Sequence, residues 1–96
     1  MAAQRSFIVS YDIADPKRLR RVARLLEGYG YRLQESVFFC QLSELMKNRL
    51  MAALAELVNH HEDQCLLVDL GPNPDVIQSF ETIGKPIAPI PKVIFV

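Results

Sequence analysis

The chain has 96 residues, 50% of them hydrophobic and 23% charged, with a formal net charge of zero. This length fits a single domain over residues 1–96, and the hydrophobic content is too high for a disordered chain. No apolar run approaches the roughly 20 residues of a membrane span, and the N-terminus lacks the apolar region of a signal peptide. Both cysteines lie in apolar runs without metal-type spacing. We therefore expect reduced cysteines and a cytoplasmic protein.

The zero net charge conceals an asymmetry between the two halves of the chain. Residues 1–49 carry nine basic and five acidic side chains, whereas residues 50–96 carry two basic and six acidic ones. Five of the cations fall within the eight positions 17–24. A cluster this local indicates the kind of partner more directly than the overall balance does.

The first predicted element is a strand over residues 6–11. Its alternation places residues 7, 9 and 11 on one face and residues 8, 10 and Asp12 on the other. A helix follows, with Asp15 as its N-cap and Pro16 as its first residue. Gly28 and Gly30 are expected to end this helix. Its predicted apolar face is formed by Leu19, Val22, Ala23 and Leu26.

The remaining predicted elements follow in order along the chain. They are short strands over residues 31–34 and 36–41, a helix capped by Ser43 that frays near residues 59–61, a strand over 64–70, a short helix within 75–83, and a terminal strand over 92–96. The apolar face of the second helix is expected to include Met46, Leu50 and Leu54. No internal repeat or low-complexity segment interrupts this series.

The order of these elements predicts an α+β fold, the ferredoxin-like β-α-β-β-α-β sheet with an extra C-terminal strand. Two helices cover only one face of such a sheet, yet residues 36–40 and 65–68 are apolar or nearly so at consecutive positions, as in strands buried on both faces. We therefore expect a second copy of the chain to cover the other face, giving a twofold homodimer. Residues 84–96 would be a proline-rich arm and terminal strand that pack on the partner protomer.

Asp12 is the candidate catalytic and metal-ligating residue. It ends an apolar strand directly before the basic helix, and Mg²⁺ often takes only one or two protein carboxylates together with substrate phosphates. In a twofold dimer, two copies of Asp12 could face each other across the axis and hold a metal for phosphoryl transfer. The alternative is a strand-end aspartate that hydrogen-bonds the turn after it.

The basic helix supplies candidate nucleic-acid-binding residues. Like charges at i, i+4 are mildly destabilising, so five cations without acidic partners at that spacing exceed what solubility needs. Phosphate contacts would explain them, and such contacts position a nucleic acid without reading its sequence. On charge placement we assign Arg21, Arg24 and, just beyond the helix, Arg32 to this role. The alternative is a solvated surface stripe.

Several segments match the pattern of a known protein family. They are Tyr11-Asp12-Ile13, Asp15 with Lys17-Arg18, residues 22–30, then Arg32, Gln34 and Ser36-Val37-Phe38, with Ile83-Gly84-Lys85-Pro86 near the end. Over residues 6–42 above all, the chain resembles the second core family of CRISPR-associated proteins, the small dimeric subunit of the spacer-acquisition machinery.

The resemblance implies a ferredoxin-like homodimer that bridges two dimers of the CRISPR-associated integrase and binds duplex DNA through its backbone during spacer integration. It also implies that Lys17 and Arg18 contact phosphates. Some relatives are described as Mg²⁺-dependent endonucleases acting on RNA or DNA, with the aspartate at the position of Asp12 as metal ligand, which favours a nuclease here too. Where the family commonly has an acidic residue after the Val-Phe pair, this chain has Phe39. The DNA-bridging role does not depend on that acid.

Three functions stay open at this point. The first is a scaffold that binds duplex DNA together with the integrase. The second is a stand-alone Mg²⁺-dependent endoribonuclease of toxin-like type, and the third is a ferredoxin-like regulatory domain with a small-molecule pocket and no affinity for nucleic acid. The charge of the basic helix argues against the third.

Overall fold

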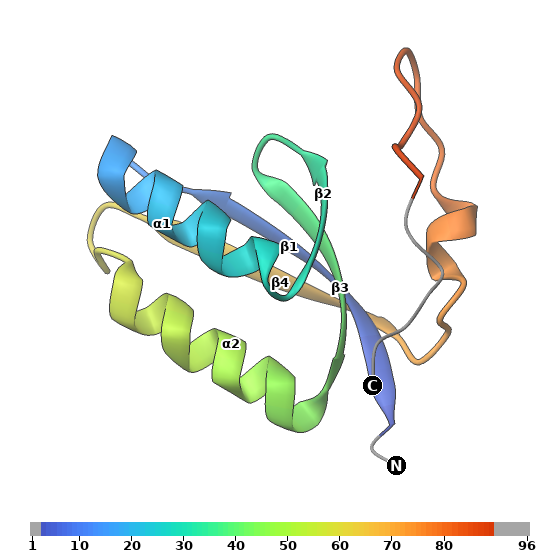
Figure 1. The fold of residues 1–96 in the computed structure, drawn as a ribbon, viewed down its shortest axis with the longest axis horizontal. Coiled ribbons are helices and arrows are strands. Elements are labelled where there is room, and N and C mark those ends of the chain that lie inside the picture. The colour runs from blue at the N-terminus through green and yellow to red at the C-terminus, as the bar shows by residue number, and fades with distance from the viewer. Residues whose placement is uncertain (1–2, 90–96) are drawn as a thin grey trace.

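A four-stranded antiparallel sheet carries two helices on one of its faces (Figure 1). The computed structural model describes residues 3–89. Its elements are β1 (Gln4–Asp12), α1 (Pro16–Glu27), β2 (Gly30–Gln34), β3 (Val37–Ser43), α2 (Glu44–Leu57), β4 (Gln64–Gly71) and the short 3₁₀ helix η1 (Val76–Ser79). The strands lie in the order β2-β3-β1-β4, and each neighbouring pair is antiparallel. The predicted ferredoxin-like α+β fold is confirmed, while the terminal strand predicted over 92–96 lies outside the described residues.

In both helices, the side chain of the N-cap residue accepts a hydrogen bond from a backbone amide of the first turn. The Asp15 carboxylate accepts a hydrogen bond from the Arg18 amide at 2.9 Å, and the Ser43 hydroxyl accepts one from the Met46 amide at 3.2 Å. Each bond satisfies one of the amides that have no partner within the first turn. Leu19, placed on the apolar face by sequence, is 39% exposed, so α1 buries its later turns instead.

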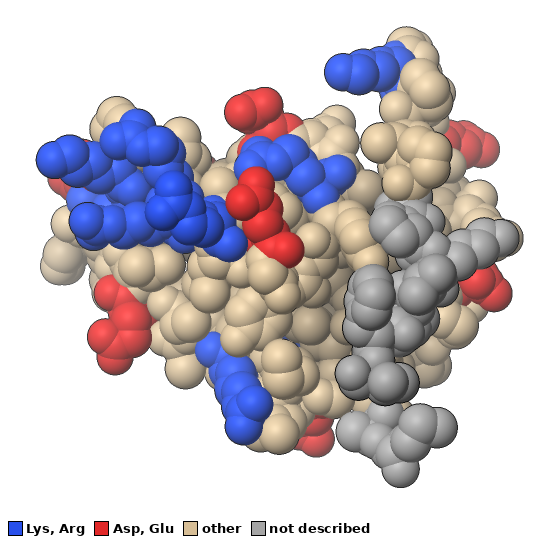
Figure 2. Space-filling view, viewed as in Figure 1, with Lys and Arg blue, Asp and Glu red and all other residues tan. Residues whose placement is uncertain are grey.

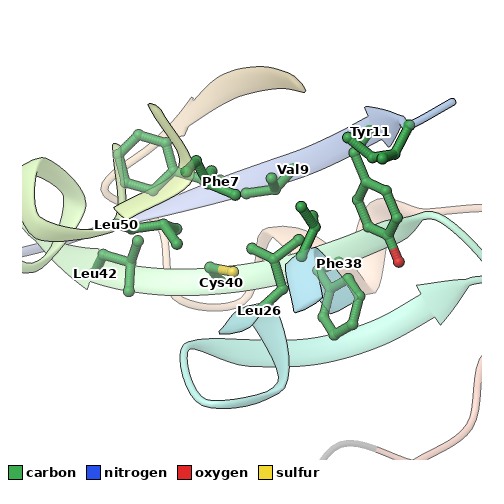
Figure 3. Packing of buried hydrophobic residues seen from close by; sticks show 11 residues of the cluster. Phe7, Val9, Tyr11, Leu26, Phe38, Cys40, Leu42 and Leu50 are labelled. Carbon is green, nitrogen blue, oxygen red and sulfur yellow. The ribbon is translucent and has the colours of Figure 1, made fainter. Parts of the chain in front are cut away.

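The core lies between the helices and the sheet. It is built from alternate residues of the two central strands and from the inner faces of the helices: Phe7, Val9, Tyr11, Phe38, Cys40, Leu42, Val22, Leu26, Leu50 and Leu54 (Figure 3). The alternation predicted for β1 is therefore correct. Both cysteines are free, as expected, and burial raises the pKa of the Cys40 thiol to about 12.

The two glycines after α1 have different roles. Gly28 caps the helix in a right-handed conformation, with φ of −80°. Gly30, predicted as part of the helix end, instead opens β2 against the middle of β3, in register with Cys40. A Cβ atom on Gly30 would overlap the Phe39 carbonyl oxygen and the Cys40 sulfur. Glycine is needed there because the two backbones approach too closely for any side chain.

We call the sheet face opposite the helices the open face. Over β3 it is covered by the chain's own C-terminal segment, where Phe80, just after η1, packs edge-on against Phe39 with ring centroids 6.1 Å apart. Phe39 is consequently only 2% exposed. On β4, by contrast, Leu66 and Val68 are 51% and 48% exposed. The apolar run of β3 is thus explained within one chain, while that of β4 is not.

The part of the chain that the structure describes contains no helix long and apolar enough to cross a membrane.

Candidate nucleic-acid interface and metal position

Asp12 is the last residue of β1 and is exposed to solvent. Strand alternation puts it on the side of the open face, because its neighbour Tyr11 points into the core. Two hydrogen bonds hold Tyr11 to the β2–β3 turn: its hydroxyl donates to the Glu35 carbonyl at 3.0 Å, and its amide donates to the Ser36 carbonyl at 3.1 Å. The backbone that carries Asp12 is therefore fixed on one side by the β2–β3 turn.

The turn after Asp12 is held by the carboxylate of Asp63 and not, as in the alternative interpretation, by that of Asp12 itself. Within residues 3–89 no hydrogen bond of the Asp12 side chain is found, whereas the Ala14 amide donates to Asp63 Oδ1 at 2.9 Å. The alternative in which Asp12 bonds its own turn is therefore absent from this structure. Its carboxylate stays available to a ligand.

Asp63 stands just before β4, and its side chain is fully buried. Besides the Ala14 amide it accepts from the Asn59 amide at 2.8 Å and from two nitrogens of Arg18, Nε at 2.8 Å and Nη2 at 3.2 Å. The Arg18 guanidinium, helped by the two amides, holds the pKa of this carboxyl well below its usual range. The sequence pattern does not single out Asp63, since two of its three partner residues, Arg18 and Ala14, are 45 and 49 residues away along the chain.

Two of the predicted phosphate contacts, Arg18 and Arg32, are engaged within the protein. Arg18 also donates to Glu62 Oε1 at 3.0 Å, and its side chain is only 22% exposed. Arg32 donates to the Glu35 carbonyl at 2.5 Å, and its guanidinium lies 4.9 Å from the centre of the Phe38 ring. A phosphate would have to compete with these partners at either position.

The other predicted cations gather on the outer surface of α1. Lys17, Arg21 and Arg24, joined by Arg20, line one hollow of about 310 Å³, which we call the cationic hollow. In Figure 2 these side chains form a continuous positive area over α1. No ion pair of the four is found among residues 3–89. Arg20 was not among the predicted contacts, although its i, i+4 spacing from Arg24 indicates that the two share a helix face.

The structure does not bring Asp12 and the cationic hollow into one site. The hollow lies on the outer side of the helix layer, and Asp12 belongs to the side of the open face. The described residues contain no cluster of three or more potential metal-ligating His, Cys, Asp or Glu side chains. A single free carboxylate still fits Mg²⁺, since this ion commonly keeps several waters and takes one or two carboxylates beside substrate phosphates.

Comparison with known proteins identifies the family. Residues 5–75 match the family model described as CRISPR associated protein Cas2. The chain is 44% identical over 84 residues to the CRISPR-associated endoribonuclease Cas2 of Geobacter sulfurreducens, covering 88% of each chain. It is 41% identical over 83 residues to Cas2 1 of Rhodospirillum rubrum, covering 86% of this chain and 81% of the relative. This chain therefore belongs to the Cas2 family of CRISPR-associated proteins, as the resemblance predicted.

Solved structures agree with this assignment. Streptococcus pyogenes Cas2 at pH 6.5 superposes with a TM-score of 0.74 and 32% identity, over 82% of this chain and 99% of that one. A chain of a partial Cas6-RT-Cas1–Cas2 complex superposes with a TM-score of 0.71 and 29% identity, over 96% of this chain and 99% of that one.

Proposed function

We propose that this protein is the DNA-binding scaffold subunit of a CRISPR spacer-acquisition complex, acting as a homodimer together with the CRISPR-associated integrase. The observation that carries the proposal is the cationic hollow, where four cations of α1 converge without an acidic partner among the described residues. The solved assembly named with both Cas1 and Cas2, which contains a similar chain, supports a role inside such a complex.

Duplex DNA suits the cationic hollow because like charges crowded on one helix face repel each other until an anion enters. A duplex carries one negative charge per roughly 1.7 Å of its axis, so several phosphates lie within reach of cations on one turn of an α-helix. Contacts of this kind release counterions and fix the position of the duplex, but they carry no sequence information. This matches a subunit that must accept spacers of any sequence.

A second copy of the chain would complete the scaffold. Leu66 and Val68 expose apolar surface on the β4 half of the open face, and burying a side chain of this size contributes roughly 1.5–3 kcal/mol. A twofold dimer through this face would carry two cationic hollows, one per protomer. One duplex could then be held at two separate places.

Reconstitution with the cognate integrase and duplex DNA tests the scaffold role. On a sizing column, we expect the three components to elute together at an ionic strength near 0.1 M. The same mixture without DNA and the same mixture without the integrase serve as controls. If this chain never elutes with the integrase and DNA, the scaffold proposal is wrong.

A second candidate function, metal-dependent cleavage of a phosphodiester, rests on the carboxylate of Asp12, which is exposed and forms no hydrogen bond with the described residues. Asp12 and the same residue of a second copy would hold the ion, which when bound would stabilise charge developing on the phosphate. The endoribonuclease names of the Geobacter and Rhodospirillum relatives support this candidate. Nothing in the scaffold role requires it.

The substitution Asp12→Asn separates the two functions. We expect it to abolish Mg²⁺-dependent cleavage of RNA or DNA while duplex affinity stays within about twofold, because Asp12 lies away from the cationic hollow. Asp75→Asn, which alters another exposed aspartate, is the matched control. Cleavage that survives Asp12→Asn would show that Asp12 does not carry the reaction.

The regulatory alternative is not proposed. A groove of about 740 Å³ does run between β2, β3 and residues 80–88. It lies where the C-terminal arm begins, which favours protein packing over a small-molecule ligand.

A further inference from the structure

The buried carboxylate of Asp63 has no part in the scaffold or cleavage roles as stated above. It nevertheless joins three segments that meet at the end of β1. It accepts from the Ala14 amide in the β1–α1 turn, from the Asn59 amide after α2, and from the Arg18 guanidinium in α1. The next residue along the chain, Gln64, is in register with Asp12. Asp63 is thus placed beside the candidate metal ligand without being exposed itself.

The Ala14 amide is the donor from which the Asp12 carboxylate would most readily accept a hydrogen bond. An aspartate commonly bonds the backbone amide two residues further on, which forms an Asx-turn. In this structure that amide is already bonded to Asp63 at 2.9 Å. Arg18 contacts both oxygens of Asp63, Nε at 2.8 Å and Nη2 at 3.2 Å, and so holds the carboxylate in the orientation that reaches Ala14.

We propose that Asp63, oriented by Arg18, is a positioning residue that keeps the Asp12 carboxylate free for a divalent cation by occupying the Ala14 amide. The proposal rests on the metal role of Asp12 proposed above. It gives Arg18 a structural task in place of a phosphate contact. It also explains why an ion pair with a buried carboxylate stands at this end of the sheet, while the Arg5–Asp69 pair at the other end of β4 is about half exposed.

Mn²⁺ binding to the full-length protein tests the proposal, measured by calorimetry or by water proton relaxation. We expect Asp12→Asn to remove the site and Asp63→Ala to weaken it at least tenfold, the usual effect of losing a supporting partner of a ligand. Arg18→Lys retains a cation beside Asp63 and should cost less than Asp63→Ala. Asp69→Ala breaks the exposed pair at the far end of β4 and should leave Mn²⁺ affinity unchanged.

A second readout, hydrogen exchange at the Ala14 amide, separates the positioning role from a merely structural one, because only the positioning role predicts that protection of this amide in Asp63→Ala depends on Asp12. In Asp63→Ala we expect this amide to change its shift yet stay protected from hydrogen exchange, because Asp12 takes over the bond. In the double variant with Asp12→Asn and Asp63→Ala it should exchange faster. Where Asp63→Ala does not fold, Asp63→Asn replaces it, since an amide has one acceptor oxygen for four donors. It should also weaken Mn²⁺ binding.

The possible failures are distinguishable. If Asp12→Asn abolishes the Mn²⁺ site while the folded Asp63 variant binds as tightly as the unsubstituted protein, the positioning role is wrong and the metal role of Asp12 stands. If the unsubstituted protein binds no Mn²⁺, or Asp12→Asn binds it unchanged, the metal role is wrong and the positioning proposal falls with it. Duplex binding by the cationic hollow is untouched by either result.

Discussion

The salt dependence of duplex binding gives the sharpest test of the cationic hollow. Arg21 lines this hollow beside Arg20 and Arg24 and has no ion-pair partner among residues 3–89. Arg21→Gln therefore removes one positive charge without releasing a buried acid. Arg49→Gln is the matched control, because it removes the same charge from an exposed position on α2.

The expected magnitude follows from counterion release. Each phosphate contact contributes about 0.9 to the slope of log K against log salt concentration. Arg21→Gln should therefore flatten the slope by about 0.9 if one protomer of a dimer contacts the duplex, and by about 1.8 if both do. At 0.1 M salt each lost contact weakens binding by about eightfold, so the loss of Arg20, Arg21 and Arg24 together would weaken it about 500-fold per protomer in contact.

Fluorescence anisotropy of a labelled duplex, titrated at several salt concentrations between 50 and 200 mM, measures both quantities. Two unrelated duplex sequences should give the same slopes, because phosphate contacts carry no sequence information. A slope unchanged in Arg21→Gln, or changed as much in Arg49→Gln, would refute the assignment of the cationic hollow to DNA.

Three further predictions concern the fold and its assembly. Gly30→Ala should lower the free energy of unfolding, measured in urea, by about 1–3 kcal/mol, since the added Cβ overlaps β3. Gly28→Ala, whose Cβ would have its nearest contact at 3.4 Å, should lower it less. Equal losses in the two variants would contradict this packing argument. Leu66→Glu should convert a dimer into a folded monomer in sedimentation experiments. Met51→Glu, at a similarly exposed position on α2, should leave the dimer intact. A dimer that persists in Leu66→Glu would exclude the β4 half of the open face as the dimer interface. Because the pKa of Asp63 is depressed in the folded protein, the unfolded chain binds more protons. The stability that Asp63 adds is therefore present above about pH 5 and is lost as pH falls below about 4. The difference in free energy of unfolding between the unsubstituted protein and Asp63→Asn should therefore narrow between about pH 6 and pH 3. A constant difference would contradict this prediction.

Local patterns in the sequence predicted most of the fold. The capping roles of Asp15 and Ser43, and the alternation that buries Val9 between two half-buried neighbours, depend only on residues a few positions apart. The boundaries of β1 and β3 moved by one to two residues because strand ends are set by pairing with other strands. The role of Gly30 was misjudged for the same reason, since the atoms that exclude a side chain belong to β3.

The candidate site divides in the same way. The sequence by itself determined that a carboxylate ends the first strand, that cations crowd the first helix, and that the chain resembles the Cas2 family, because these are features of neighbouring residues. Only the tertiary structure decided which of those charges are free. It paired Arg18 with Asp63 across 45 residues and left Arg21 facing solvent with Arg20 and Arg24. It also separated Asp12 from the cationic hollow, because strand alternation and helix packing direct them to opposite sides of the sheet.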